Sequence, residues 1–261
     1  MDILRIEDRD DPRIAAYRDI REKDLIGREG LFVAEGKFIL ETLLTRSRFP
    51  AVSALVLEER LAPLEPILAH APDDFPVHVA TREVMDAIAG FPVHRGILAL
   101  GHTTPSDAGP MPRGGVALLA GIANPDNIGT IFRNAAGLGI AHVLLDRRCC
   151  DPLYRKAIRV SMGASLVLPF SRVDNAADAV RTYLAAGHRA FALTPSAPIA
   201  LEQVRFGTDS LFVFGEEAQG LDADVIAQCE PVGIPMAHGT DSLNVSASSA
   251  IVFNAWRVAS A

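Results

Sequence analysis

The stretch that most restricts the fold runs from residue 234 to residue 246 and is IPMAHGTDSLNVS. It sets a proline-containing polar loop before a final helix, which the pattern predicts from Asn244 to about Val258. Apolar and small residues occupy every side of that helix, which predicts burial in a core. Its first backbone N–H groups lack partners within the helix. Ser242, Asn244 and Ser246 thus bring polar groups to a poorly solvated place, where helix capping or a bound ligand would satisfy them.

The composition excludes several classes of protein. With 261 residues, 49% of them hydrophobic, the chain can bury one large core or two modest ones. It has no run of about 18 apolar residues and starts with an acidic, polar segment, so we expect neither a membrane span nor a signal peptide. Cys149, Cys150 and Cys229 form no disulfide or metal-ligand pattern. We expect reduced thiols, a cytoplasmic location and no metal.

The charge distribution leaves the partner undecided. A net charge of −7 at pH 7 argues, taken alone, against a nucleic-acid partner. Positive charge is nevertheless concentrated within thirteen positions of the second half, opposed there only by Asp151. Such a cluster could bind RNA phosphates, or it could lie on a solvated helix face. Its members are Arg147, Arg148, Arg155, Lys156 and Arg159.

A segment rich in Pro, Gly, Ser and Thr divides the chain into two predicted domains. We place the linker at residues 105–114, between domains of residues 1–104 and 115–261. In the first domain, apolar runs alternate with helical patterns, which predicts a small α/β domain. Its expected strands are residues 31–34, 52–57, 77–79 and 96–100, and its expected helices are residues 37–46, 58–70 and 82–89.

The second domain is also predicted to be α/β. Its short, continuous apolar runs are typical of strands covered on both faces, which indicates a mostly parallel sheet. In such sheets, ligands bind beyond the carboxyl ends of the strands. The expected strands are residues 116–121, 142–145, 166–169, 190–193, 211–214 and 232–234, and the expected helices before the final one are residues 127–138, 152–160, 175–186 and 222–228.

Two further segments consist of a strand, a polar loop and a helix. In residues 121–136, GIANPDNIGTIFRNAA, the apolar positions form one stripe of a helix and Arg133 lies on another face. In residues 211–221, LFVFGEEAQGL, Gly215 permits close approach of a ligand to the backbone and Gly220 permits a sharp turn. No GxGxxG follows the first strand of the domain, which speaks against a nicotinamide dehydrogenase, and no GxxxxGK[ST] or GxSxG is present.

Three of these segments carry a family resemblance. NPDNIGTIFRNA (124–135), FGEEAQGL (214–221) and IPMAHGTDSLNVS (234–246) resemble, in order, the three signature motifs of the SpoU/TrmH family, RNA ribose 2′-O-methyltransferases of the SPOUT superfamily. RVSMGASLVLP (159–169) is similar to the family's stretch between the first two motifs. LFVAEGKFILETLL (31–44) and HRGILAL (94–100) resemble the family's N-terminal substrate-binding domain, itself similar to small ribosomal-type RNA-binding proteins.

The resemblance implies S-adenosylmethionine as the cofactor and gives candidate residues for its site. It identifies Arg133 with the catalytic arginine and places Asn127, Ser242 and Asn244 on the substrate side of the methyl group. The implied cofactor-binding residues are Thr194, Gly215, Glu217, Gly220, Ile234, Pro235, Met236 and Leu243.

One position departs from the family pattern. His238 stands before Gly239 where the family commonly has glycine, although the spacing from Ile234 to Leu243 is kept. This departure puts the local turn in doubt, and the motif assignment stands.

The implied architecture is a C-terminal SPOUT-type parallel sheet with a deep trefoil knot, a small N-terminal α/β RNA-binding domain, and a homodimer. The N-terminal domain favours ribosomal over transfer RNA as the substrate. A base-methylating SPOUT enzyme, a transfer-RNA 2′-O-methyltransferase and a non-catalytic RNA-binding or assembly protein stay open as alternatives. Because a guanidinium is a poor base, we expect Arg133 to stay charged, bind the neighbouring phosphate and stabilise the developing alkoxide.

Overall fold

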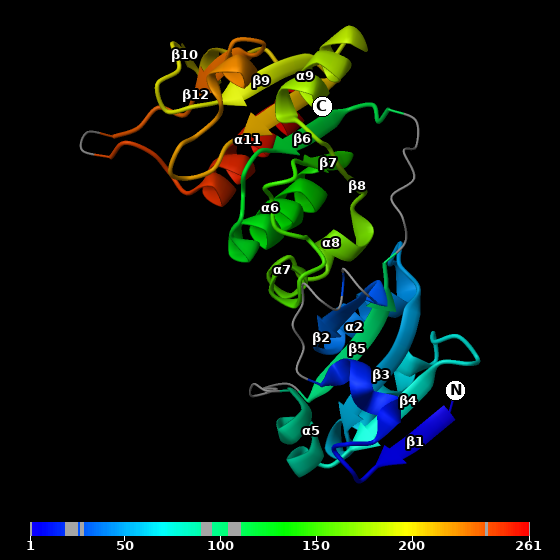
Figure 1. Cartoon of the computed structure of the whole chain (residues 1–261). Helices are drawn as coiled ribbons and strands as arrows, with labels where there is room; N and C mark the ends of the chain where they lie inside the picture. Colours follow the sequence, from blue (N-terminus) through cyan, green and yellow to red (C-terminus); the bar gives the residue numbers. More distant parts are fainter. Residues whose placement is uncertain are drawn as a thin grey trace. The chain divides into compact units, whose positions relative to one another are not determined.

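A computed structural model describes residues 2–18, 26, 29–89, 96–103, 111–237 and 240–260. The chain divides into two compact units, each with its own sheet (Figure 1). The N-terminal unit consists of residues 1–105 and 152–167, and the C-terminal unit of residues 106–151 and 168–261. Residues 105–110 of the predicted linker lie outside the described residues, as does His238.

The N-terminal unit contains a five-stranded mixed sheet with the strand order β1-β4-β3-β5-β2. β1, β4 and β3 are parallel, and β5 is antiparallel to both of its neighbours. The edge strand β1 was not predicted, because Ile6 is its only buried residue and the pairing rests on the backbone. The strands are β1 (Asp2–Ile6), β2 (Leu31–Glu35), β3 (Ala51–Leu57), β4 (Pro76–Ala80) and β5 (Ile97–His102).

The helices of this unit depart from the predictions at two places, and the first is the short helix η1, which was not predicted. The helix expected over residues 58–70 is broken into three short pieces at Pro63 and Pro66, because proline cannot donate the backbone hydrogen bond that continues a helix. The helices here are η1 (Pro12–Tyr17), α2 (Lys37–Thr45), α3 (Glu58–Leu61), η3 (Ala62–Leu64), α4 (Glu65–Leu68) and α5 (Arg82–Ala89).

Residues 152–167, which we call the returning segment, were predicted as part of the second domain but are grouped with the N-terminal unit. The segment forms α7 (Arg155–Val160) and α8 (Ala164–Val167), which contact β2 and α2. The guanidinium of Arg155 binds the buried carboxylate of Glu35 at 2.6 Å, and the backbone N–H of Arg48 donates to Leu166 O at 2.9 Å. The strand expected over residues 166–169 was therefore wrong, since a short apolar run does not separate a strand from a buried helix.

The C-terminal unit contains a seven-stranded sheet with the order β10-β12-β9-β11-β6-β7-β8. Every pairing in it is parallel, which confirms the predicted parallel α/β class. The strands are β6 (Gly115–Leu119), β7 (His142–Leu145), β8 (Phe170–Arg172), β9 (Arg189–Leu193), β10 (Ile199–Ala200), β11 (Ser210–Phe214) and β12 (Glu230–Gly233). The described helices are α6 (Pro125–Leu138), α9 (Ala176–Ala185), η4 (Leu201–Gln203), α10 (Ala223–Ile226) and α11 (Val245–Ser260).

Helix α6 ends at the predicted Leu138 but begins at Pro125, two residues before the predicted start at Asn127. Asn124 Oδ1 accepts a hydrogen bond from Asp126 N at 2.9 Å, Pro125 occupies the first turn, and Gly139 takes the left-handed conformation after the last residue. The expected apolar stripe is fully buried, and it consists of Ile128, Ile131, Phe132 and Ala135.

Helix α11 is buried on one side only. Val252 and Phe253 are fully buried, whereas Ile251 is 39% and Val258 is 71% exposed. The prediction that this helix is buried on every side is therefore wrong for a single chain, and an apolar strip is left on the surface. Among the described residues, no helix combines the length and apolar character needed to cross a membrane.

Candidate functional site

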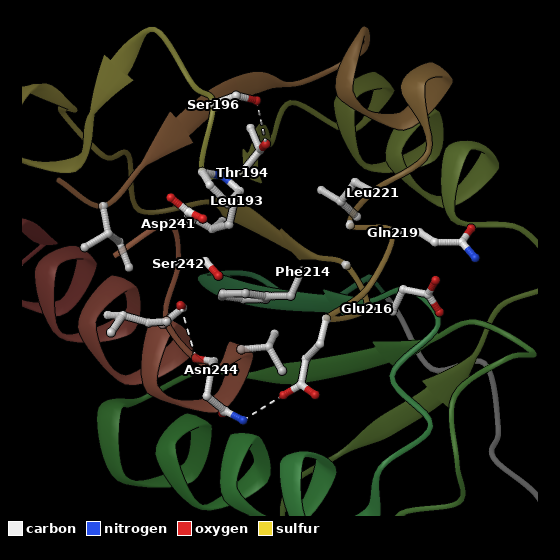
Figure 2. Close-up of a pocket in the computed structure, with 18 of the residues that line it drawn as sticks. Leu193, Thr194, Ser196, Phe214, Glu216, Gln219, Leu221, Asp241, Ser242 and Asn244 are labelled. Carbon is white, nitrogen blue, oxygen red and sulfur yellow. Dashed lines mark hydrogen bonds between the residues drawn. The ribbon is translucent and has the colours of Figure 1, made fainter. Parts of the chain in front are cut away.

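A pocket of about 650 Å³ lies beyond the carboxyl ends of three neighbouring strands, β9, β11 and β12 (Figure 2). Its walls come from the loops after those strands and from the start of α11. Two of the three predicted loops, around residues 215–221 and 241–245, thus face each other across one cavity. The third, at the start of α6, reaches them through Asn127.

A hydrogen-bonded set joins the three loops. Asn127 Nδ2 donates to Glu217 Oε1 at 2.8 Å, and Asn244 Nδ2 donates to the same oxygen at 2.7 Å. Asn244 Nδ2 also lies 3.0 Å from Asn127 Oδ1. Asn127 is only 5% exposed, so its amide needs these partners. One carboxylate therefore holds together residues from segments separated by 27 and 90 positions in the sequence.

Asn244 also caps the final helix. Its Oδ1 accepts from the backbone N–H of Ser246 at 2.8 Å and from the Ser246 hydroxyl at 2.6 Å. Asn134 of α6 donates to Ser246 O at 2.8 Å and to the hydroxyl of buried Ser249 at 3.0 Å. Capping is thus confirmed, and the same side chain faces the pocket with its amide nitrogen (Figure 2).

The loop after β11 depends on its two glycines. A Cβ on Gly215 would lie 2.4 Å from the carbonyl carbon and oxygen of Gly220, a distance that side chains do not tolerate. Gly220 itself has φ +73°, in the left-handed region that favours glycine. Gly215 was expected to admit a ligand close to the backbone, but the close approach is to the loop's own backbone. The turn at Gly220 is as predicted.

The lining of the pocket includes most of the predicted cofactor residues. Predicted residues in the lining are Thr194, Gly215, Glu217, Gly220, Ile234, Met236, Ser242, Leu243 and Asn244, and Pro235 is exposed outside it. Not predicted were Leu193, Ser196, Phe214, Gln219, Leu221 and Asp241, labelled in Figure 2. Leu193 and Phe214 end predicted strands, so the rule about carboxyl ends could have identified them.

The charged residues of this lining are all acidic. Glu216, Glu217 and Asp241 contribute carboxylates, while the described lining contains neither lysine nor arginine. Apolar side chains such as Leu193 and Phe214 provide the rest of the wall. The arrangement therefore favours a ligand with a cationic part and an apolar part over a nucleoside phosphate.

Arg133 lies on α6 but outside the pocket lining. It is exposed and, within the described part of the chain, its guanidinium makes no ion pair or hydrogen bond. Six residues separate it from Asn127, which corresponds to roughly 120° around the helix and about 9 Å along it. Its cation is therefore available to a molecule that approaches from outside.

The predicted basic cluster is divided between the two units. Arg147 and Arg148 belong to the C-terminal unit, and the other three residues to the returning segment. Each of the four arginines pairs with a carboxylate distant in sequence: Arg147 with Asp174, Arg148 with Asp222, and both Arg155 and Arg159 with Glu35. Arg148 also pairs with its near neighbour Asp146. The sequence showed Asp151 as the one acidic residue within this cluster. It did not show that carboxylates outside the cluster neutralise these arginines.

Asp146 organises the loop after β7. Its Oδ1 accepts hydrogen bonds from the backbone N–H groups of Gly121, Arg148 and Cys149, each with an N–O distance of 3.0 Å. Burial by itself would raise the pKa of Asp146, but the hydrogen bonds from Gly121, Arg148 and Cys149 lower it below its ordinary value. Burial raises the pKa of the Cys149 thiol to about 12, so this cysteine is not a nucleophile. No group of residues within the described ranges is arranged to hold a metal ion.

The comparison with known families decides the assignment. The model of the SpoU rRNA Methylase family matches residues 115–254, more than half of the chain. The chain belongs to this family. It is 36% identical over 266 positions to an uncharacterized tRNA/rRNA methyltransferase of Mycobacterium tuberculosis, with 97% of this chain and 91% of the relative covered.

Solved structures of the SpoU/TrmH type share the fold. An AdoMet-bound rRNA methyltransferase from Sinorhizobium meliloti matches with a TM-score of 0.83 at 20% identity, over 98% of both chains. A structure described as an RNA 2′-O ribose methyltransferase matches with a TM-score of 0.82 at 22% identity, also over 98% of both chains. These matches confirm the predicted α/β fold with a parallel sheet, and the knot stays a prediction.

Proposed function

We propose that this SpoU-family chain transfers a methyl group from S-adenosylmethionine to a ribose 2′-hydroxyl of RNA, with ribosomal RNA as the favoured substrate. The observation that carries the proposal is the hydrogen-bonded set of Asn127, Glu217 and Asn244 at the edge of the acidic pocket. It joins the three family motifs into one site.

The pocket fits the cofactor in size and charge. About 650 Å³ is within the range of small-molecule sites, and three carboxylates suit a sulfonium and an ammonium group. The residues that would hold it include Thr194, Met236 and Leu243, with apolar Leu193 and Phe214 beside them. When bound, S-adenosylmethionine supplies an electrophilic methyl group, so the protein need only bind, orient and exclude water.

The side chains around the pocket would have different roles. Ser242 and Asn244 would orient the ribose hydroxyl, while buried Asn127 acts through Glu217 as a positioning residue. Arg133, charged and unpaired in the described chain, would bind the neighbouring phosphate and stabilise negative charge that develops on the 2′-oxygen. The guanidinium would not accept the proton itself, because arginine is a very poor base.

Arg148 is proposed to support the pocket wall instead of binding RNA. Its guanidinium links Asp146, at 3.0 Å, to Asp222, at 3.2 Å, which directly follows the pocket-lining loop. We expect Arg148→Gln to weaken S-adenosylmethionine binding about 3- to 5-fold, the range for a partly exposed ion pair. Arg147→Gln is the matched control, since the partner of Arg147 among the described residues is the exposed Asp174. Isothermal titration without RNA measures both, and equal affinities would contradict this role.

We also propose a homodimer, supported by the apolar strip on α11. Ile251 and Val258 are exposed there, on a helix that packs against α6 through its other side. We expect the wild type to show twice the mass of one chain in light scattering, and Val258→Glu to shift it toward the mass of one chain. Ile3→Glu, an equally conspicuous exposed apolar position in the N-terminal unit, should leave the dimer intact. A monomeric wild type would contradict the proposal.

Mapping ribose methylation across total RNA, with and without the gene, tests the function and identifies the RNA. The proposal predicts one or a few ribose positions in ribosomal RNA that lose methylation when the gene is deleted. A lost base methylation would favour a base-methylating SPOUT enzyme, and a lost transfer-RNA site would correct the substrate. Unchanged RNA would favour a non-catalytic binding or assembly protein.

A further inference from the structure

The N-terminal unit presents an aromatic side chain to solvent with no packing role. Phe38 is 60% exposed on α2, while Ile39, Leu40 and Leu43 of the same helix are buried. Met162, in the returning segment, is 42% exposed. Exposed apolar side chains that lie together on a surface are candidates for contact with a partner.

Thr42 contacts the backbone of Phe38 and lies beside Gly163, the residue that follows Met162. Its hydroxyl donates to Phe38 O at 2.9 Å, one turn back along α2. A Cβ on Gly163, the residue after Met162, would lie 3.2 Å from the Thr42 side chain. Met162 has φ +53°, the one positive value found for a non-glycine residue in the described chain. The backbone thus adopts an unfavourable conformation at the point where Met162 is presented beside α2.

The two segments that carry Phe38 and Met162 also carry cationic side chains. Arg46 donates to the Thr42 hydroxyl at 3.3 Å, and Lys37 directly precedes Phe38. Arg159 lies 3.6 Å from Glu35, but the shorter ion pair of that carboxylate, at 2.6 Å, is with Arg155. The side chain of Arg159 is 42% exposed, so its guanidinium can also bind a second anion. We call Lys37, Phe38, Arg46, Arg159 and Met162 the Phe38 surface.

The charge of this region contrasts with the rest of its unit. Residues 35–48 and 152–167 contain six Lys or Arg and two Asp or Glu, whereas the remainder of the N-terminal unit contains ten and sixteen. Glu35 is buried against arginine, so Glu41 on α2 is the exposed carboxylate of these stretches. A net acidic unit with its positive charge gathered around an exposed aromatic favours a polyanion that also has flat apolar faces.

We propose that the Phe38 surface binds an unpaired nucleotide of the RNA substrate, with the base stacked on Phe38 and against Met162 and the flanking phosphates on Lys37, Arg46 and Arg159. The inference rests on the proposed RNA methylation, whose partner it specifies as RNA with an accessible single-stranded loop. It also gives the returning segment a role: it completes the RNA-binding surface of the N-terminal unit.

Fluorescence anisotropy with two labelled RNA probes, a stem–loop and a blunt duplex with the same stem, tests the surface. We expect Phe38→Ala to weaken stem–loop binding about 10-fold, the loss of one stacked base, with little change for the duplex. Phe38→Trp should retain stem–loop affinity. Ile3→Ala, an exposed apolar control at 51% exposure in the same unit, should bind both probes like wild type. Circular dichroism and a thermal unfolding curve verify that the N-terminal unit, which carries each substitution, is folded.

Photo-crosslinking identifies the contact directly. A stem–loop with 4-thiouridine in the loop should crosslink to peptides that contain Phe38 or Met162. Wild-type stem–loop affinity for Phe38→Ala, an equal loss on both probes, or a changed oligomeric mass would overturn the inference. Stem–loop binding by wild type without methyl transfer to any RNA would instead contradict the proposed function and leave the surface supported.

Discussion

Replacing Arg133 with alanine is expected to lower the rate of methyl transfer at least about 100-fold, with the affinity for S-adenosylmethionine within about 2-fold of wild type. The rate should fall while the affinity is kept, because of where Arg133 lies. Arg133 lies outside the pocket lining, so its loss leaves the acidic walls intact. Its exposed, unpaired guanidinium is the charge proposed to bind the RNA phosphate and the developing alkoxide. Single-turnover methylation gives the rate, and isothermal titration gives the affinity.

Two further variants define what Arg133 contributes. Arg133→Lys keeps the charge but loses the paired donors of the guanidinium, and its rate should stay well below that of wild type. Arg205→Ala is the control, because Arg205 is another exposed arginine of the C-terminal unit and lies outside the three motifs and the pocket lining. A lysine variant with wild-type rate would show that bidentate geometry is irrelevant and would refute this role.

Replacing Gly215 with alanine is expected to weaken S-adenosylmethionine binding at least about 10-fold, the effect of overpacking a closely packed site. The new Cβ would lie 2.4 Å from the backbone of Gly220 and 2.6 Å from Leu221 N. Because these are backbone atoms, relief requires the loop to open, which moves the wall that carries Glu216 and Glu217. Titration of S-adenosylmethionine measures the loss, with circular dichroism to verify the fold.

Gly207→Ala provides the comparison for this substitution. A Cβ on Gly207 would have no atom of another residue within 4 Å beyond its neighbours, so the variant should bind the cofactor like wild type. Wild-type affinity of Gly215→Ala would mean that the close approach of Gly215 and Gly220 does not shape the pocket. If Gly215→Ala fails to fold while Gly207→Ala folds, the close approach of Gly215 to Gly220 is needed for stability.

Local patterns were sufficient for much of the C-terminal unit. The stripe of α6 and the parallel strands are each encoded within a few residues, and both are confirmed. The same holds for the convergence of two motif loops, because neighbouring parallel strands end at one edge of a sheet. The partnership of Asn127 with Glu217 spans 90 positions, so the sequence alone could suggest it only through the family motifs.

The failures also have physical causes. Pro63 and Pro66 were a local signal that the helix over residues 58–70 would break, and the prediction overlooked it. The returning segment is different, since nothing within residues 152–167 shows that Arg155 binds a carboxylate 120 positions earlier. The exposed side of α11 has the composition of a core helix, so periodicity could not separate burial within one chain from burial between chains.

Alkaline hydrolysis of RNA methylated by the purified protein tests the central claim most directly. A methyl group on the 2′-oxygen removes the nucleophile that cleaves the adjacent phosphodiester bond. With methyl-labelled S-adenosylmethionine, the account predicts label in alkali-stable dinucleotides, and none from Arg133→Ala. Label in mononucleotides would place the methyl on a base and contradict the ribose assignment. Absence of label with every RNA, from protein that binds S-adenosylmethionine, would contradict the proposed activity.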